Sequence, residues 1–393
     1  MELIRTVLLV HEYYQQPGGE DEAFAAESGL LEDRGHRVLR YVDHNDRIKD
    51  IGSLSLVRDT IWSSRAYREL RELVRTEKPQ VVHFHNTFPL ISPAAYYAAK
   101  TEGVPVVQTL HNYRLFCTNA YFFRDGHVCE DCLGKTPPWP GVLHSCYRGS
   151  RAASGTVAAM LTTHRALQTW TKMVDTYIVL TNFARQKFIQ GGLPAQKVKV
   201  KPHFVGPDPG LGEGRGGYAL FVGRLSPEKG VDTLLSAWEY IGGELCLKIV
   251  GDGPLTPRVT EVARRVSGVE WLGQQPLEEV YRLMGGAHFL VFPSELYETF
   301  GRVSIEAFAK GTPVVASRIG AIAELVDHHR TGLHFNPGDP KDLAARVEWI
   351  LRHPLELARM RREARTEFEA KYTAERNYQM LRRIYETVAA GRN

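Results

Sequence analysis

The stretch from Phe292 to Pro313 reads FPSELYETFGRVSIEAFAKGTP. A mostly apolar run, from His288 to Phe292, leads into it and has the length and content of a buried strand. The polar residues that follow predict a loop, and the pattern from about Gly301 onward predicts a helix. Glu298 and Glu306 bracket the start of that helix. A strand, a loop and a helix in this order are typical of one unit of a parallel α/β sheet.

The two glutamates are too far apart to act on one bond. Their spacing of eight residues corresponds to roughly 12 Å even in a continuous helix, whereas paired carboxylates of glycoside hydrolases lie about 5 to 9.5 Å apart. We therefore expect Glu298 and Glu306 to hold the two ends of an elongated ligand. The N–H groups of Phe300, Gly301 and Arg302 would seat a phosphate between them. A nucleotide sugar has this shape, whereas a solvated loop residue and a surface helix residue are the alternative interpretation.

Length and composition are typical of a soluble globular protein. The 393 residues are 43% hydrophobic and 24% charged, which favours two or three domains with ordinary cores. The net charge of +4 is too small to indicate a nucleic-acid partner. The apolar run from Val7 to Val10 is far shorter than a signal segment or a membrane span of about 20 residues. We therefore expect a cytoplasmic protein, with a place at the inner face of the membrane left open.

Predicted strands and helices alternate along both halves of the chain. The first half carries strands at Ile4 to Val10, His36 to Val42, Gln80 to Phe84, Pro105 to Leu110 and Thr176 to Leu180, and helices at Asp21 to Arg34 and Asp59 to Glu77. The second half carries strands at Tyr218 to Val222, Leu245 to Val250, Val269 to Leu272, His288 to Phe292, Pro313 to Ala316 and Gly332 to Phe335, and a late helix that opens at Asp339 and Pro340. A Pro- and Gly-rich linker separates the halves at residues 201–217. This pattern predicts an α/β protein with two Rossmann-like, doubly wound parallel sheets.

The loop after the first strand of the second half carries two cations. It reads GRLSPEKG from Gly223 to Gly230. The planar fork of Arg224 and the point charge of Lys229 suit a diphosphate, and a surface salt bridge with Glu228 is the alternative. The sequence contains no Asp-x-Asp stretch to hold a divalent ion, so we expect these cations to take the place of a metal.

In their order along the chain, these motifs resemble family 4 of the retaining nucleotide-sugar glycosyltransferases. The order is Gly18-Gly19-Glu20, His111 after a strand, GRLSPEKG, the Gly-Asp-Gly-Pro turn at residues 251–254, Glu298 and Glu306, Lys-Gly-Thr-Pro-Val-Val-Ala-Ser at 310–317, and Pro-Gly-Asp-Pro at 337–340. The resemblance covers essentially the whole chain. It implies a GT-B fold, with two Rossmann-like domains facing a central cleft. The implied domains are an acceptor-binding domain at residues 1–203, a donor-binding domain at 204–373, and a last helix within 374–393 that crosses back to the first domain.

The resemblance also implies roles for individual residues. Glu298 would contact the donor sugar, Glu306 the ribose, and Arg224 and Lys229 the diphosphate, while His111 would reach the sugar from the other side. The remaining expected donor-site residues are Gly18, Gly19, Thr299, Phe300 and Gly301. For the acceptor we expect Glu20 and His85, which alternates with His83 on one strand and so shares its face. Core packing of His85 is the alternative.

The implied reaction transfers a sugar from a UDP-, GDP- or dTDP-sugar to a glycan or lipid-linked acceptor with retention of configuration. It needs no catalytic cofactor or metal ion, and it belongs to the synthesis of a polysaccharide, lipid-linked glycan or glycoconjugate. Two alternatives stay open. One is another GT-B enzyme, an epimerase or a phosphorylase, and the other is a sugar-nucleotide binding module without turnover.

Four of the five cysteines lie in an insertion at residues 112–150. Cys117, Cys129, Cys132 and Cys146 give the spacing C-x11-C-x2-C-x13-C, which in a cytosolic protein favours metal binding over disulfides. We expect a structural zinc ion held by four thiolates, with His127 or His144 as substitute ligands. Reactive thiols, disulfides and an iron–sulfur cluster are the alternatives.

A basic stripe is expected on the helix from Arg58 to Arg75. Arg58, Arg65, Arg68 and Arg75 fall near one side of it. Such a helix would either rest on an anionic membrane surface or simply face solvent.

Overall fold

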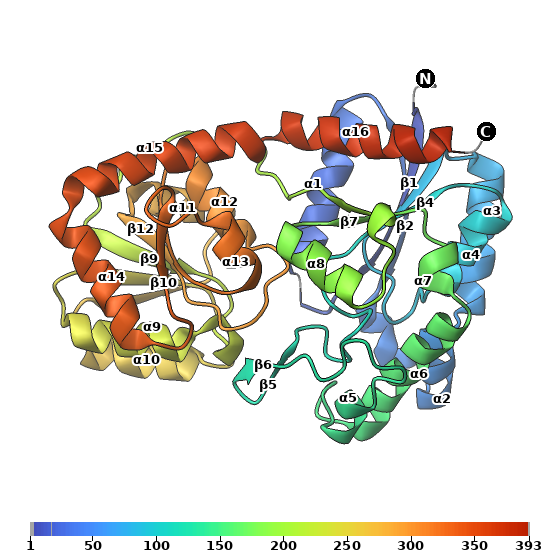
Figure 1. The fold of residues 1–393 in the computed structure, drawn as a ribbon, viewed down its shortest axis with the longest axis horizontal. Coiled ribbons are helices and arrows are strands. Elements are labelled where there is room, and N and C mark those ends of the chain that lie inside the picture. The colour runs from blue at the N-terminus through green and yellow to red at the C-terminus, as the bar shows by residue number, and fades with distance from the viewer. Residues whose placement is uncertain (1–3, 17, 392–393) are drawn as a thin grey trace. The chain divides into compact units, whose positions relative to one another are not determined.

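The computed structural model describes residues 4–16 and 18–391, which form two compact units. The first unit comprises the chain up to Phe122, then Cys129–Pro202, and the chain from Asn377 onward. The second unit comprises Phe123–Val128 and His203–Arg376. Each unit is a parallel sheet covered by helices (Figure 1).

The first unit contains a six-stranded parallel sheet in the order β2-β1-β3-β4-β7-β8. Its strands are β1 (Thr6–Tyr13), β2 (Arg37–His44), β3 (Val81–Phe84), β4 (Val106–Thr109), β7 (Thr176–Val179) and β8 (Val198–Val200). Its helices are α1 (Gly19–Asp33), α2 (Ser53–Ile61), α3 (Ser64–Glu77), α4 (Ala94–Thr101), α5 (Trp139–Leu143), α6 (Arg151–Ala166), α7 (Thr169–Lys172) and α8 (Asn182–Gln190), with 3-10 turns η1 (Asn45–Asp50) and η2 (Ala195–Lys197). The strand order reverses between β1 and β3, so the crevice beyond their carboxyl ends is the topological switch point.

The second unit has a parallel sheet in the order β11-β10-β9-β12-β13-β14. Its strands are β9 (Tyr218–Val222), β10 (Cys246–Val250), β11 (Val269–Gly273), β12 (Phe289–Phe292), β13 (Val314–Ser317) and β14 (Gly332–Phe335). Its helices are α9 (Val231–Ile241), α10 (Thr256–Arg265), α11 (Leu277–Gly286), α12 (Arg302–Ala309), α13 (Gly320–Leu325), α14 (Pro340–Arg352) and α15 (Pro354–Lys371), with the 3-10 turn η3 (Pro227–Lys229). Here the switch point lies between β9 and β12. The last helix, α16 (Ala374–Ala390), belongs to the first unit from Asn377 onward.

Apolar side chains from the sheets and the helices that cover them form a core in each unit. In the first unit, Val7 and Leu9 of β1 pack with Phe24 of α1 and with Leu381 and Tyr385 of α16. In the second unit, strand residues of β9, β10 and β12 pack against α9, α10 and α14. These cores explain why a chain with alternating strand and helix patterns forms two doubly wound sheets, as the sequence predicts.

The prediction of one helix from Asp59 to Glu77 is wrong, because two helices occupy this region. Helix α2 ends at Ile61, Trp62 is extended with φ −149°, and the Ser63 side chain caps α3 by accepting the Ala66 N–H at 3.3 Å. The break ends the continuous basic stripe.

Three of the four arginines of the predicted stripe pair with acids of the first unit. Arg58 pairs with Asp59, Arg65 with Asp43 and Glu69, and Arg75 with Glu72. These pairs favour a solvated, charge-balanced surface over a basic membrane-facing stripe. Contact with a membrane stays a prediction.

Much of the predicted linker is packed against the second unit. The N–H of Gly212 donates to Lys310 O at 3.0 Å, and the N–H of Gly214 donates to Gly285 O at 2.8 Å. A Cβ atom on Gly212 would collide with the backbone of Gly285. The glycines in this stretch therefore allow close backbone contact rather than looseness.

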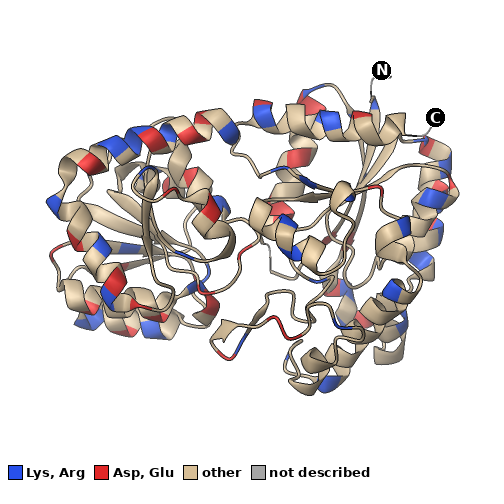
Figure 2. Cartoon of the chain, in the orientation of Figure 1, with Lys and Arg blue, Asp and Glu red and all other residues tan. Residues whose placement is uncertain are grey.

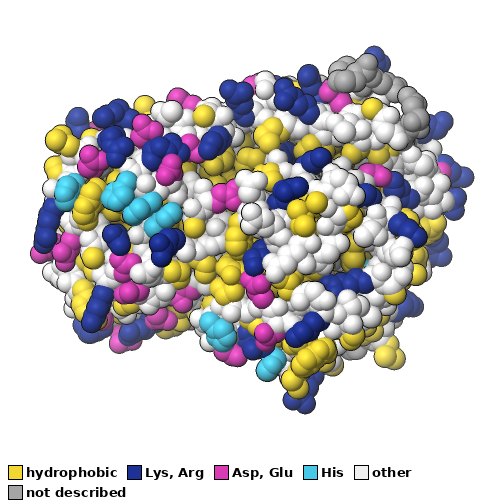
Figure 3. Space-filling view, viewed as in Figure 1, with side chains coloured by type: hydrophobic (Ala, Val, Ile, Leu, Met, Phe, Trp, Pro, Cys, Tyr) yellow, Lys and Arg dark blue, Asp and Glu magenta, His cyan; other side chains and the backbone are white. Residues whose placement is uncertain are grey.

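Both signs of charge are distributed over the helices of each unit (Figure 2). Exposed hydrophobic side chains are scattered among them on the face drawn in Figure 3. Within residues 4–16 and 18–391, no helix is long and apolar enough to cross a bilayer.

Candidate functional site

The cation-rich loop of the second unit lies at its topological switch point. It follows β9 and leads through η3 into α9, and Gly230 has a left-handed φ of +67°. A Cβ atom on Gly230 would collide with the carbonyl oxygen of Pro293, which follows β12. The Glu295 N–H also donates to Glu228 O at 2.9 Å. The loops after β9 and β12 are therefore held backbone to backbone.

Glu298 accepts hydrogen bonds from both loops. The Lys229 ammonium forms an ion pair with Glu298 Oε1, and the Ser294 hydroxyl donates to the same oxygen at 2.8 Å. The Glu298 side chain is 15% exposed and the Lys229 side chain 28% exposed. Lys229 thus pairs with Glu298, whereas Glu228 accepts the Ser226 hydroxyl at 2.6 Å.

The start of α12 is closely packed against the end of β12. Gly301 precedes the helix with φ +112°, and a Cβ atom there would lie 2.7 Å from the Phe292 ring. The side chain of Phe300, just before this glycine, is buried. Glu306, one turn into the helix, is 9% exposed and lies 3.5 Å from the Arg302 guanidinium. Glu306 is therefore not the surface residue of the alternative interpretation.

The Gly-Asp-Gly-Pro turn packs closely against the backbone of the cation-rich loop. The Leu225 N–H donates to Asp252 O at 2.9 Å. Gly251 has φ +132°, and Cβ atoms on Gly251 and Gly253 would collide with the carbonyl oxygens of Gly223 and Leu225. Only glycine at these two positions allows the turn to lie this close to the loop.

The switch point of the first unit carries histidines instead of cations. His85 follows β3, His111 lies just past β4, and both are buried. His111 Nε2 lies 3.0 Å from His85 Nδ1. The expected acceptor residue Glu20 lies near the start of α1, where its Oε1 accepts the Asn112 amide at 2.6 Å.

Glu20 has a perturbed carboxyl group. The residue is half-buried, but its Oε2 atom is fully buried. Burial raises the pKa of Glu20 to about 7, and hydrogen bonds from Asn112 and Tyr14 offset part of this rise. A carboxyl group with this pKa changes its charge near neutral pH, which is typical of functional sites.

Two family models match the chain. The model described as Glycosyltransferase Family 4 matches residues 25–208, and the one described as Glycosyl transferases group 1 matches residues 216–353. The uncharacterised glycosyltransferase MJ1178 of Methanocaldococcus jannaschii is 34% identical over 403 aligned positions, which span 98% of this chain and 99% of that protein. The chain belongs to the GT4-type glycosyltransferases.

Solved structures agree with this glycosyltransferase in fold. HepE of Anabaena in complex with UDP-glucose superposes with a TM-score of 0.70 at 16% identity, over 97% of this chain and 99% of HepE. Sucrose-phosphate synthase of Thermosynechococcus elongatus superposes with a TM-score of 0.72 at 18% identity, over 98% and 100%. With two Rossmann-like parallel sheets, the glycosyltransferase has a GT-B fold.

The predicted site residues of the glycosyltransferase fall into two groups, one in each unit. The second unit brings together Lys229 and Glu298 and places Arg224, Thr299, Phe300, Gly301 and Glu306 on the adjoining loops and helix. The first unit brings together His85 and His111 and places Gly18, Gly19 and Glu20 at the start of α1. Gly18 has an extended φ of −139° and open space around its Cα, so nothing in its local conformation requires glycine. Pro17, in the same loop, lies outside the described residues.

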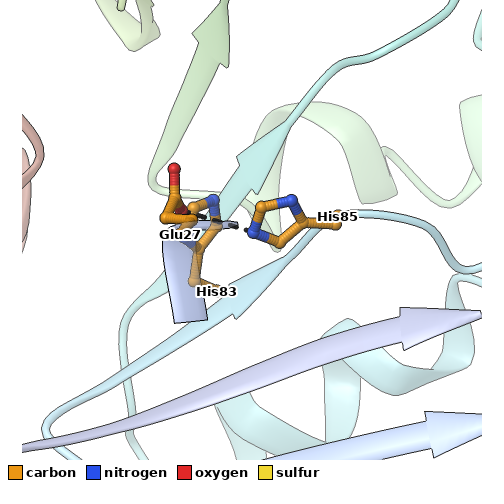
Figure 4. Close-up of side chains that lie close together, drawn as sticks. All are labelled: Glu27, His83 and His85. Carbon is orange, nitrogen blue, oxygen red and sulfur yellow. Dashed lines mark ion pairs between the residues drawn. The ribbon is translucent and has the colours of Figure 1, made fainter. Parts of the chain in front are cut away.

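Sequence reasoning missed a buried charged cluster beside His85. Glu27 of α1 lies 3.1 Å from His83 Nδ1 and 3.3 Å from His85 Nε2 (Figure 4). Lys201, which the sequence placed in the linker, donates to Glu27 Oε2 at 2.7 Å. One signal was present, because Glu27 stands at helical spacing among the core residues Phe24, Leu30 and Leu31.

The four cysteines of the glycosyltransferase between residues 117 and 146 lie near one another without forming a tight cluster. Cys117 and Cys132 are buried, and Cys129 and Cys146 are half-buried. Burial raises the pKa of Cys132 to about 12, and Cys117, Cys146 and Cys129 add to the rise. Among the described residues, the group whose ligand atoms all lie within 4.8 Å of one another is instead Glu27, His83 and His85.

Proposed function

We propose that this glycosyltransferase moves a sugar from a nucleotide diphosphate sugar to a hydroxyl group of a glycan or lipid-linked acceptor, with retention of anomeric configuration. The observation that carries the proposal is the ion pair of Lys229 with Glu298 at the switch point of the second unit. It combines a cation for a phosphate with a carboxylate for sugar hydroxyls at the crevice where parallel sheets bind ligands.

Lys229 and Arg224 hold the diphosphate in this proposal. Arg224 is exposed on the loop, and the Lys229 ammonium already has an anionic partner in Glu298. A diphosphate carries more charge than a carboxylate and competes for the ammonium. The N–H groups at the start of α12 add donors and the positive end of a helix dipole. Together these groups stabilise the negative charge that develops on the leaving nucleoside diphosphate.

Carboxylates at the two ends of this anion site orient the rest of the donor. Glu298, fixed by the Ser294 hydroxyl, accepts hydrogen bonds from the sugar hydroxyls. Glu306, buried on α12, accepts them from the ribose. The acceptor hydroxyl attacks from the face that the diphosphate leaves, and His111 and Glu20 of the first unit orient sugar and acceptor.

Two other functions make different predictions. A sugar-nucleotide binding module binds donor without turnover, and an epimerase or phosphorylase turns over without a hydroxyl acceptor. HepE is bound to UDP-glucose in its crystal structure, which favours starting with the UDP series among UDP, GDP and dTDP.

A two-step experiment tests the proposal. A nucleotide at 100 times its Kd stabilises the native protein by about 2.7 kcal/mol, which raises the Tm by roughly 5–11 °C. The sugar of the stabilising series is then offered with glycan acceptors, and the anomeric configuration of the product is read by NMR. Inverted product or a binding-only result would contradict the proposal.

We also propose a zinc ion as a staple of the cysteine segment. The short hairpin of β5 (Phe123–Arg124) and β6 (His127–Val128) and the helix α5 are the only regular elements between Cys117 and Cys146 in the described chain. Four neighbouring thiols, two of them buried, are a donor set that zinc prefers as thiolates. The Gly141 N–H donates to the Cys132 sulfur and lowers its pKa against the effect of burial. Bound zinc would stabilise all four thiolates and order the segment that follows His111.

A further inference from the structure

A buried polar chain leads from His111 to the segments where the polypeptide passes between the two units. His111 Nε2 lies 3.0 Å from His85 Nδ1, and His85 Nε2 lies 3.3 Å from Glu27 Oε1, short of hydrogen-bond alignment. Glu27 Oε2 accepts the Lys201 ammonium at 2.7 Å. These four residues are each no more than 8% exposed. Their chemistry is therefore set by one another rather than by water.

The charges in this chain balance as one anion and one cation. Burial alone would raise the pKa of Glu27, but Lys201 and the two histidines outweigh it and hold the pKa well below its usual range. Burial and the neighbouring His83 lower the pKa of His85 to about 4. At neutral pH, Glu27 is thus a carboxylate paired with the Lys201 ammonium, and His85 is neutral.

The carboxylate selects one tautomer of His85. A carboxylate oxygen only accepts hydrogen bonds, so a bare Nε2 at 3.3 Å would set two lone pairs against each other. The favoured tautomer carries its proton on Nε2 and leaves Nδ1 as an acceptor. The nitrogen that faces Nδ1 is His111 Nε2, which must then be the donor. His111 then keeps its proton on Nε2 and carries none on Nδ1.

The surroundings of Glu27, His83 and His85 suit a set of hydrogen-bonded side chains better than a metal site. The ligand atoms of Glu27, His83 and His85 lie within 4.8 Å of one another (Figure 4). However, the Lys201 ammonium already supplies a positive charge to Glu27. His83 lies 2.7 Å from the Tyr385 hydroxyl through Nδ1 and 2.8 Å from the Thr109 hydroxyl through Nε2. Both of its ring nitrogens therefore have hydroxyl partners.

Lys201, at the far end of this polar chain from His111, is held by residues at the two points where the polypeptide leaves and re-enters the first unit. Lys201 immediately precedes the end of one part of the first unit at Pro202, and Asn377 is the residue at which the chain re-enters it. Asn377 Oδ1 accepts the Lys201 ammonium at 3.2 Å, and Asn377 Nδ2 donates to Pro202 O at 2.6 Å. The ammonium is thereby held in place for Glu27.

From this geometry we propose that Glu27 and Lys201 are positioning residues that fix the proton of His111 on Nε2. The inference rests on the proposed function only for the role of His111 in sugar transfer. The arrangement of protons itself does not depend on any substrate.

The test is a nitrogen NMR spectrum of substrate-free protein labelled with 15N-histidine, in which the shift of each ring nitrogen shows whether it carries a proton. His85→Asn and His111→Asn variants assign the signals. We expect both rings to be protonated on Nε2 in the parent. In Glu27→Gln, the amide donates to His85 Nε2, and both rings shift towards protonation on Nδ1. A parent His111 protonated on Nδ1, or unchanged tautomers in the variant, would overturn the proposal.

A second variant guards against misfolding. Glu27→Gln leaves a buried ammonium without its carboxylate, which is strongly destabilising, whereas removing both charges is tolerated much better. The double variant Glu27→Leu/Lys201→Met removes both charges and every acceptor at position 27, so we expect it to fold and to lose the preference of His85 for a proton on Nε2. Glu32→Gln is the matched control, since Glu32 is an exposed residue of the same helix that pairs with Arg40, and it should leave the histidine spectrum unchanged.

Turnover gives a second readout that separates the inference from the proposed function. We expect kcat of the double variant to fall by roughly 10- to 100-fold, the usual effect of removing a group that orients a site residue, while KM for the donor changes little. A parent without transferase activity that still shows the expected tautomers would refute the proposed function and leave the inference standing. Unchanged kcat together with shifted tautomers would overturn the positioning role.

Discussion

The two units place their predicted site residues at the same point of similar sheets, but those residues are partly exposed ions in one unit and buried histidines in the other. In the second unit, the Lys229 and Glu298 side chains are 28% and 15% exposed, and Arg224 is exposed. In the first unit, His85 and His111 are 3% and 8% exposed, and their rings face each other at 3.0 Å. The sheet topology is therefore shared by the two predicted sites, and the difference between them lies in how far their charged and polar side chains are exposed to water.

The difference follows from the cost of moving charge. A partly exposed ion pair contributes little net energy, because water competes for both partners, so Lys229 can exchange Glu298 for a phosphate at low cost. A buried pair such as Glu27 with Lys201 is expensive to break. The second unit is thus suited to bind and release an anion, and the first to hold protons in fixed positions.

The largest expected effect comes from the exchangeable pair. Lys229→Ala removes the cation that we assign to the diphosphate, and we expect turnover to fall by roughly 10³-fold, the upper end for loss of one preorganised charge or donor. The Tm should change little, because the pair is partly exposed. Steady-state kinetics and thermal melting of the same preparation measure both quantities.

Lys341→Ala is the matched control for this variant. Lys341 is an exposed lysine of the same unit, at the start of α14, and we expect parent-like turnover there. Near-normal activity of Lys229→Ala would break the assignment of the second unit as the donor site.

The next effect concerns the cysteine segment of the first unit. Zinc bound by Cys117 and Cys146 would close a loop of about 30 residues, worth about 3–4 kcal/mol by loop-closure entropy. We expect Cys132→Ser to lose the metal and to lower the Tm by roughly 6–16 °C. Metal analysis by mass spectrometry and thermal melting check this.

The fifth cysteine supplies the control. Cys246 lies on β10 of the second unit, and Cys246→Ser should keep both zinc and Tm. Nucleotide binding should survive zinc removal, whereas acceptor use should not. Parent protein that is purified without zinc and melts like the Cys132→Ser variant would rule out the staple.

Regular patterns made most of the fold predictable. Every strand predicted from an apolar run has a counterpart in the sheets. Asp339 caps α14 by accepting the N–H groups of Lys341 and Asp342, with Pro340 in the first turn, as its sequence predicts. These features depend on residues that are close in the sequence, so a short stretch of sequence is enough to predict them.

The remaining features depend on contacts between distant residues. The break at Trp62 follows a residue with no helix-breaking character, and only the Ser63 cap marks it. Glu27 and Lys201 are separated by 174 residues, so no local pattern shows that each neutralises the other. A lysine in a Pro- and Gly-rich stretch reads as exposed linker, although it is 2% exposed in the structure.

A further expected effect is a pH dependence of stability in the first unit. Burial raises the pKa of Glu20 to about 7 and that of Glu12, which accepts the N–H groups of Leu90 and Ile91, to about 8. The ordinary value is 4.5. Both groups therefore hold a proton in the folded state that the unfolded state releases. The stability that they contribute is present below pH 4.5 and is lost as the pH rises to about 7 or 8.

Glu20→Gln and Glu12→Gln separate these two contributions. Each glutamine is neutral at every pH, so each variant should lack the decrease in unfolding free energy that its glutamate causes. The decrease caused by Glu12 should extend about one pH unit higher than that caused by Glu20. Denaturant unfolding between pH 4.5 and 8.5 measures this, and subtracting the parent curve removes the opposite contribution of histidines such as His85, whose pKa burial lowers. Variant curves parallel to the parent curve would show that both carboxylates are ionised in the folded protein. The contrast between the two units would then rest on the buried histidines alone.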